Sequence, residues 1–147
     1  MLHARQHEGG GMNGFTLQLR DATRSERIEG VTAFVGEDAS GSFGILARHA
    51  RFMTALVFGL ARYRVGEGAW QFLALPGALL YFADNTLSLN TRRYLRDTDY
   101  ERISEALREK LIVEEATLQR MKDSLHRLEE EMLKRLWEMR RGAGGAP

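Results

Sequence analysis

The chain has 147 residues and a formal net charge of +1, from 21 basic and 20 acidic residues. This length suits one domain, or a small domain with an appendage, and the balanced charge argues against a nucleic-acid-binding protein. Cysteine is absent, which excludes disulfides, zinc–thiolate sites and a thiol nucleophile.

The first segment, residues 1–14, reads MLHARQHEGGGMNG and has no periodic apolar pattern. Its three consecutive glycines predict a disordered lead, and Met12 is a candidate start beside Met1. The segment lacks the basic-then-apolar pattern of a secretory signal. No apolar run in the chain approaches the ~20 residues of a membrane span. We therefore expect a cytoplasmic protein.

Residues 15–93 carry short apolar runs separated by turn residues. The segment GEDASGS (36–42) has the composition of a loop, and GEG (66–68) that of a hairpin turn. This regular spacing predicts a β-sandwich of about eight to ten short strands. The expected strands are FTLQL (15–19), IEGVTAFV (28–35), ARFMTALVF (50–58), LARYRV (60–65), AWQFLAL (69–75), ALLYFA (78–83) and TLSLNTR (86–92).

Residues 98–141 contain neither glycine nor proline and are rich in strong helix formers. Thr98 and Glu101 have the spacing of a capping box, and Gly142 is expected to end the helix, with residues 142–147 as a flexible tail. The helix carries an apolar column at seven-residue intervals, formed by Leu111, Leu118, Leu125, Met132 and Met139.

This column, the helix seam, needs a partner because it is a single apolar stripe. One possibility is a long helix that packs against another chain. The other is a helical hairpin, with a turn near residues 114–115 or 123–124.

The stretch GSFGILARHARFMTAL, residues 41–56, places His49 between two arginines. A catalytic histidine would need a nucleophile or base held beside it, and no nucleophile elbow or triad spacing is present. The preceding glycines lack the Gly-Lys-Ser/Thr ending of a phosphate loop. The other histidines show no metal-ligand spacing. We expect no catalytic, cofactor or metal site, and interpret His49 as a structural or contact residue.

The same stretch resembles the signature region of the epsilon subunit of F-type ATP synthases. That family typically shows Gly-x-(Phe/Leu)-Gly-Ile-Leu/Tyr-Pro-Gly-His-Ala-Pro before a strand similar to Leu-Thr-Ala-Leu. FGLARYR and ALPGALLYFADNTLSLNTR, further along, are similar to the strand and hairpin that follow in the family. The matching positions are Gly41, Phe43, Gly44, Ile45, Leu46, His49, Ala50, Thr54, Ala55 and Leu56.

Some positions depart from this family pattern. Ala47 and Arg48 stand where the family has Pro-Gly, and Arg51 stands where it has a second proline. These departures resemble the divergent N-type branch, which is often sodium-linked. The family's nucleotide motif, Asp-x-x-Arg-Ala, has only a loose counterpart at residues 99–103, so the resemblance does not imply a bound nucleotide.

The resemblance implies a non-catalytic rotor subunit of the central stalk, which couples ion flow through the c-ring to ATP synthesis or hydrolysis. The β-sandwich would contact the gamma subunit and the c-ring. The C-terminal helix would reach the catalytic alpha and beta subunits and inhibit ATP hydrolysis. The chain would lie at the cytoplasmic face of the bacterial inner membrane, held there only through the complex. The contact residues implied are Ser40, Gly41, Ser42, Phe43, Gly44 and His49, with Phe43 expected as an exposed aromatic side chain on a tight loop.

Two other classes of function remain open on the residues alone. A free-standing β-sandwich adaptor that dimerises through a coiled coil would use the same helix seam. An enzyme would depend on His49 alone. Whether the coupled ion is H⁺ or Na⁺ is decided by carboxylates of the c-ring, on another chain.

Overall fold

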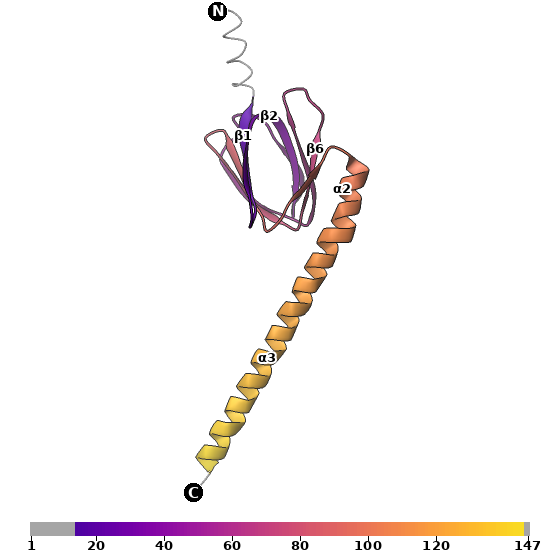
Figure 1. The fold of residues 1–147 in the computed structure, drawn as a ribbon. Coiled ribbons are helices and arrows are strands. Elements are labelled where there is room, and N and C mark those ends of the chain that lie inside the picture. Colours follow the sequence, from indigo (N-terminus) through magenta and orange to yellow (C-terminus); the bar gives the residue numbers. More distant parts are fainter. Residues whose placement is uncertain (1–13, 146–147) are drawn as a thin grey trace, which may run out of the picture. The chain divides into compact units, whose positions relative to one another are not determined.

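The computed structural model of the chain describes residues 14–145, and their side chains as far as residue 142. All but Gly14 of the predicted disordered lead therefore lies outside the described residues, as do residues 146–147. Within the described part, nine strands precede a helical region (Figure 1). The strands are β1 (Phe15–Arg20), β2 (Ser25–Asp38), β3 (Gly41–Ile45), β4 (Phe52–Leu56), β5 (Gly59–Val65), β6 (Gln71–Leu75), β7 (Ala78–Ala83), β8 (Thr86–Asn90) and β9 (Leu95–Asp97).

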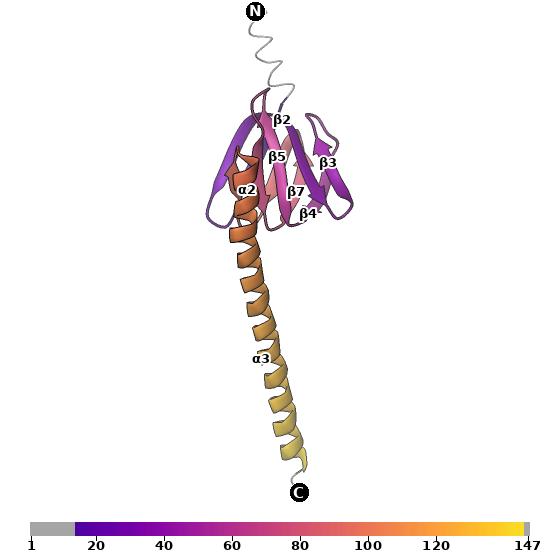
Figure 2. The same cartoon turned by 90° about the vertical axis from the view of Figure 1, so that its right-hand side faces the viewer.

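The strands follow the order β1-β8-β7-β4-β2-β5-β6-β9, and β3 pairs with β2 outside this path. The 14-residue strand β2 pairs with β1 through its first part and with β3 and β5 through its second. This double pairing folds the sheet over on itself, so that the strands enclose a core (Figures 1 and 2). The predicted β-sandwich is confirmed.

Alternate residues of the strands fill this core. In β1, Phe15, Leu17 and Leu19 are at most 2% exposed, while the residues between them face outward. Phe15 meets Phe82 of β7 edge to face, with 5.6 Å between the ring centroids. The burial of such side chains is the main favourable contribution to folding. The largest members of the core are Tyr94, Phe34, Phe82, Leu17, Leu19, Ile45, Leu73, Leu75, Leu80, Leu87 and Leu89.

The prediction of a loop over residues 36–42 is wrong, because the pairing of β2 with β3 continues almost to the turn. β2 runs to Asp38, β3 begins at Gly41, and only two residues connect them. Gly41 has a φ of +124°, which a residue with a side chain adopts only with strain. Glycines and serines in this stretch therefore build a tight hairpin, and their loop-like composition concealed β3.

Strand β9, which pairs with β6, was also not predicted from the sequence, and side-chain hydrogen bonds link it to Glu26 of β2. The Glu26 carboxylate accepts hydrogen bonds from the Tyr94 hydroxyl and from Arg96, the latter at 2.9 Å. The Tyr94 hydrogen bond lowers the pKa of Glu26. Burial, together with this carboxylate, raises the pKa of Tyr94 to about 12. These contacts fix the strand that leads into the helical region.

Within the described residues the first helix, α2 (Tyr100–Ala106), begins one residue later than the capping box at Thr98 requires. Asp99 is the N-cap, and its carboxylate accepts from the backbone N–H groups of Glu101 at 2.9 Å and Arg102 at 3.3 Å. Asp97 in turn accepts the backbone N–H of Asp99 at 2.9 Å. A carboxylate is well suited to this position because it also opposes the positive end of the helix dipole.

The helical region continues from α2 through a π-helical turn, η1 (Leu107–Leu111), into α3 (Ile112–Gly145). The predicted long helix is confirmed, and α3 has no turn near residues 114–115 or 123–124, so the hairpin alternative is wrong. The stop predicted at Gly142 is also wrong. Gly142 is not in the left-handed conformation that ends a helix, and α3 runs on to Gly145.

The start of the helical region is packed on the sandwich. Ile103 and Leu111 are at most 2% exposed and form a small cluster with Ala74 of β6, which Phe72 and Leu107 border. The chain divides directly after this cluster into two compact units, Met1–Ile112 and Val113–Pro147. Leu111 therefore belongs to the first unit, although it is the first member of the helix seam.

We predict different costs for removing two members of the seam. Leu111→Ala should lower the free energy of unfolding of the first unit by about 2–4 kcal/mol, because it leaves a cavity at a buried site. Leu118→Ala, the matched control one heptad later, should cost less than about 1 kcal/mol because Leu118 is 36% exposed. Urea unfolding followed by tryptophan fluorescence measures both. Equal costs would contradict the assignment of Leu111 to the sandwich.

Candidate functional site

The hairpin between β2 and β3 carries most of the contact residues that the resemblance implies. Ser40 lies in the turn, and its backbone N–H donates to the Asp38 carboxylate at 2.9 Å. Asp38 also accepts from the hydroxyls of Ser40 and Thr54, the second at 2.7 Å. The hydrogen bond from the Ser40 hydroxyl, followed by that from Thr54, lowers the pKa of Asp38. The carboxylate thus ties the hairpin tip to β4 while ionised.

Within β3 the predicted contact residues point to opposite faces. Ser42 and Gly44 are exposed, whereas Phe43 is half-buried and packs against the core. The Phe43 ring meets Phe52 edge to face, with 5.3 Å between centroids. The expectation of an exposed aromatic side chain at this loop is therefore wrong. The alternation of a strand turns Phe43 inward and leaves the small polar residues at the surface.

His49 is exposed and lies in the segment between β3 and β4. Its ring packs near Phe52 and Phe82, with centroid distances of 5.6 and 5.8 Å, and its Nδ1 lies 2.7 Å from the carbonyl oxygen of Ala50. The backbone N–H of His49 donates to the Leu46 carbonyl at 3.2 Å. These contacts give His49 a structural role in shaping the segment. Across residues 14–145, no group of three or more metal-ligating side chains is assembled.

Arg48 adopts the left-handed backbone conformation, with a φ of +64°. Its N–H donates to the Asn85 side-chain oxygen at 2.7 Å, and the Asn85 amide donates to the Gly14 carbonyl at 2.8 Å. Asn85 therefore joins three segments that are distant in the sequence. The family that the sequence resembles has glycine at the position of Arg48. The left-handed backbone explains this preference, because glycine adopts this conformation without strain.

We predict that Arg48→Gly stabilises the sandwich by about 0.5–1 kcal/mol, because relief of left-handed strain outweighs the added flexibility of the unfolded chain. Arg51→Gly is the matched control. Arg51 is not in the left-handed region, so its replacement should destabilise by about 0.5–1 kcal/mol. Urea unfolding of the full chain measures both. A destabilising Arg48→Gly would contradict the assigned strain.

A second candidate contact surface lies on strands β4 and β7. It was not predicted from the sequence. Met53 pairs with Tyr81 and Ala55 with Leu79, all four on the outward side. Met53 is 62% exposed and Leu79 is 49% exposed. We name this surface, together with the neighbouring Val57, the β4–β7 face. Soluble monomers rarely expose contiguous apolar patches of this kind without a partner.

The sequence contains the signal that finds the β4–β7 face. In FMTAL and ALLYFA, apolar residues occupy both alternating positions, whereas in FTLQLR one position is polar. A strand that is apolar on both sides is either buried on both faces or covered by another molecule. Here only one side faces the core of the chain.

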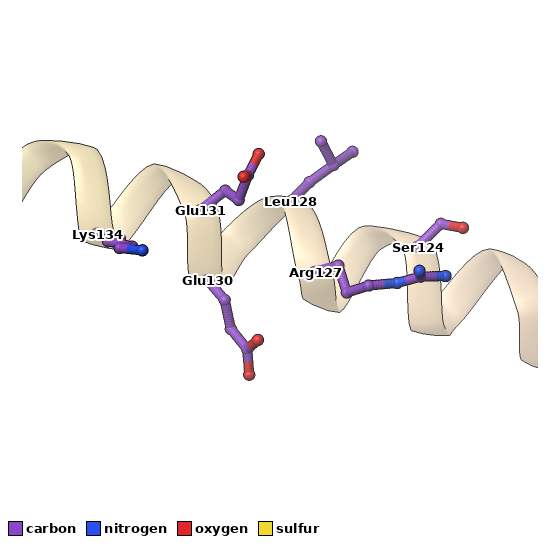
Figure 3. Close-up of a pocket in the computed structure, with 6 residues that line it drawn as sticks. All are labelled: Ser124, Arg127, Leu128, Glu130, Glu131 and Lys134. Atoms are coloured by element: carbon purple, nitrogen blue, oxygen red, sulfur yellow. The ribbon is translucent and has the colours of Figure 1, made fainter.

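The helix seam is the third candidate surface and the second that the sequence predicts. Beyond Leu111 its members on α3 are exposed, from 36% at Leu118 to 70% at Met139. A shallow hollow of about 660 Å³ on the same helix is lined by residues between Ser124 and Lys134. Figure 3 shows Leu128 and Glu130 pointing to opposite sides of the ribbon. A hollow lined by a single helix is open to solvent, so the exposed seam is the relevant feature of α3.

Three comparisons with known proteins bear on this arrangement. The family model described as ATP synthase, Delta/Epsilon chain, beta-sandwich domain matches residues 15–97. ATP synthase epsilon chain 2 of Cereibacter sphaeroides is 38% identical over 68 residues, which cover 44% of this chain and 47% of that protein. ATP synthase epsilon chain 2 of Paraburkholderia xenovorans is 37% identical over 68 residues, covering 44% and 49%.

Among solved structures, a chain in the OSCP/F1/c-ring assembly of Euglena gracilis mitochondrial ATP synthase has a similar fold. The TM-score is 0.54 and the identity 20%, over 67% of this chain and 63% of that chain. At this identity the likeness supports the fold alone.

Fold and surfaces define the chain as a β-sandwich protein with a helical extension. Because the matched domain model spans more than half of its residues, the chain belongs to the ATP synthase delta/epsilon chain family. The chain spans about half the length of the curated relatives it matches.

Proposed function

We propose that the chain is the epsilon subunit of a rotary F-type ATP synthase or ATPase and works as a non-catalytic part of the central-stalk rotor. The observation that carries this proposal is the match of the family's β-sandwich domain to residues 15–97. Both curated relatives are named as epsilon chain 2. A rigid sandwich with an exposed apolar face and an exposed helix suits a subunit that transmits force through contacts with other chains.

In this proposal the β4–β7 face docks on the gamma subunit, and the β2–β3 hairpin with the His49 segment contacts the c-ring. The two surfaces differ in chemistry. The β4–β7 face is broad and apolar, which suits a stable interface between rotor subunits. The hairpin exposes Ser42 and Gly44, and Arg48 is exposed in the segment that follows β3, which suits a small polar contact.

Met53→Glu should weaken binding of the full chain to purified gamma subunit at least tenfold, because the new carboxylate loses its hydration in an apolar interface. The control is Gln18→Glu. Gln18 lies on β1 on the same outward side of the sheet, two strands away from β7, and should bind as the parent chain does. Surface plasmon resonance measures both affinities. Binding by Met53→Glu at parental affinity would remove the β4–β7 face from the interface.

The second part of the proposal is that α3 restrains ATP hydrolysis by reaching the catalytic alpha and beta subunits. The exposed seam supports this, because its apolar side chains are available to another helix. The association of the chain with the cytoplasmic side of a bacterial membrane follows in this proposal from its place in the complex. The departures at Ala47, Arg48 and Arg51, together with relatives named epsilon chain 2, support in this proposal a place in the divergent N-type branch.

A truncation after Ile112 tests the regulatory part. It removes Val113–Pro147 as a unit and keeps Ile103 and Leu111 on β6, so the sandwich should remain folded and assemble. ATP hydrolysis by the reconstituted complex should then rise at least twofold, because a restraint on rotation has been removed. Deletion of 98–141 is a less suitable variant because it uncovers Ala74. Normal assembly with unchanged hydrolysis would refute inhibition while leaving the rotor role intact.

A further inference from the structure

The last turns of α3 differ from the rest of the seam. Between Leu118 and Leu128 the exposed apolar residues form a narrow stripe. From residue 132 onward the stripe widens, because Leu133 and Trp137 add a second row. With about 100° between successive residues, the apolar side chains then cover an arc of about 160°. The exposed members of this arc are Met132, Leu133, Leu136, Trp137 and Met139.

The charges of residues 132–141 are arranged around this arc. Arg135 borders one edge and Arg141 the other, while Glu138 lies on the opposite side of the helix. Lys134 and Arg140 complete a set of four basic residues against one acidic residue. Arg140 lies within the arc, and its long side chain is able to reach outward past its apolar neighbours.

We propose that residues 132–141 lie on the surface of an anionic lipid bilayer, with the apolar arc buried among the headgroups and the arginines beside the lipid phosphates. Basic residues at both edges and an acidic residue opposite the arc are the charge pattern of a helix lying in the plane of a membrane. Trp137 supports this occupant, because tryptophan favours the boundary between water and hydrocarbon. Among the residues that the structure describes, none of the helices has the length and apolar content to cross a bilayer.

A second copy of the chain fits these residues less well. A two-stranded coiled coil buries two positions in each heptad, whereas Leu133 and Trp137 lie outside that seam. The second seam position, which Met121 and Leu128 occupy earlier, is taken by Arg135. The proposal extends beyond the rotor role, in which the complex alone holds the chain at the membrane. It gives the end of α3 a second occupant, so contact with the bilayer and contact with the alpha and beta subunits are alternative states of this helix.

The affinity of the chain for lipid vesicles should depend on the charge of the lipid. Each basic residue near an anionic surface raises the partition coefficient roughly fivefold. The full chain should co-sediment with vesicles of phosphatidylcholine and phosphatidylglycerol in equal parts, and far less with phosphatidylcholine alone. The chain has two tryptophans, so Trp70→Phe leaves Trp137 as the only reporter. Its emission should shift to the blue on binding.

Matched double variants test the position of the charges. Arg135→Gln/Arg141→Gln should weaken binding to the anionic vesicles roughly 25-fold. Arg120→Gln/Arg127→Gln makes the same charge change earlier on α3 and should bind within about twofold of the parent chain. Circular dichroism checks that both variants keep the helix.

Several outcomes would overturn the proposal: no binding to anionic vesicles, equal binding to neutral vesicles, or equal losses in the two double variants. A blue shift without vesicles, accompanied by dimers in sedimentation velocity, would assign the arc to a second copy instead. None of these outcomes affects binding to the gamma subunit, so failure here and failure of the rotor proposal are distinguishable.

Discussion

The packing of Ile103 and Leu111 against Ala74 is the interaction on which the organisation of the chain depends. It attaches one turn of α2 and the π-helical turn to β6, and directly beyond it the first compact unit ends. Outside this contact, α2 meets the strands at the Tyr100–Phe72 ring pair and the Arg102–Asp97 ion pair, and Tyr100 and Arg102 are both exposed. With the packing on Ala74, the first unit comprises the sandwich and a short docked helix, and the second unit is a helix whose seam is exposed.

The alternation of inward and outward residues along each strand decides which side chains of the sandwich are buried and which are exposed. The inward positions form a core that needs no partner, and most outward positions are polar. On β4 and β7 the outward positions are apolar, and Met53 and Leu79 are left largely exposed by the described residues of the first unit. The hairpin before β4 is instead tied down by the Asp38 carboxylate and exposes small side chains. Two neighbouring surfaces with different chemistry follow from this division, one suited to a tight interface and the other to a lighter contact.

Much of the fold was predictable because the physical signal is local. Alternation in FTLQLR and the short apolar run ALLYFA between two turns predict strands, and the absence of glycine and proline from residues 98–141 predicts a long helix. The missed elements are those whose sequence contradicts their conformation. β3 has the composition of a loop, and β9 is only three residues long. Phe43 was expected at the surface, because its glycine neighbours concealed the alternation that turns it toward Phe52. His49 had no predicted partner, and its aromatic neighbours come from strands that the topology brings together.

The sequence by itself determined the class of the fold, the resemblance of GSFGILARHARFMTAL to a known family, and the seven-residue column of the helix. These are patterns of neighbouring residues, and their spacing alone sets which side each residue takes. Only the tertiary structure decided that Leu111 is buried while Leu118 is exposed, because the two are equivalent in the repeat and differ only in reaching β6. It also decided that Arg48 occupies a left-handed position held by Asn85, a contact across 37 residues of chain. Long-range packing therefore decides which residues are buried among positions that are equivalent in the local repeat.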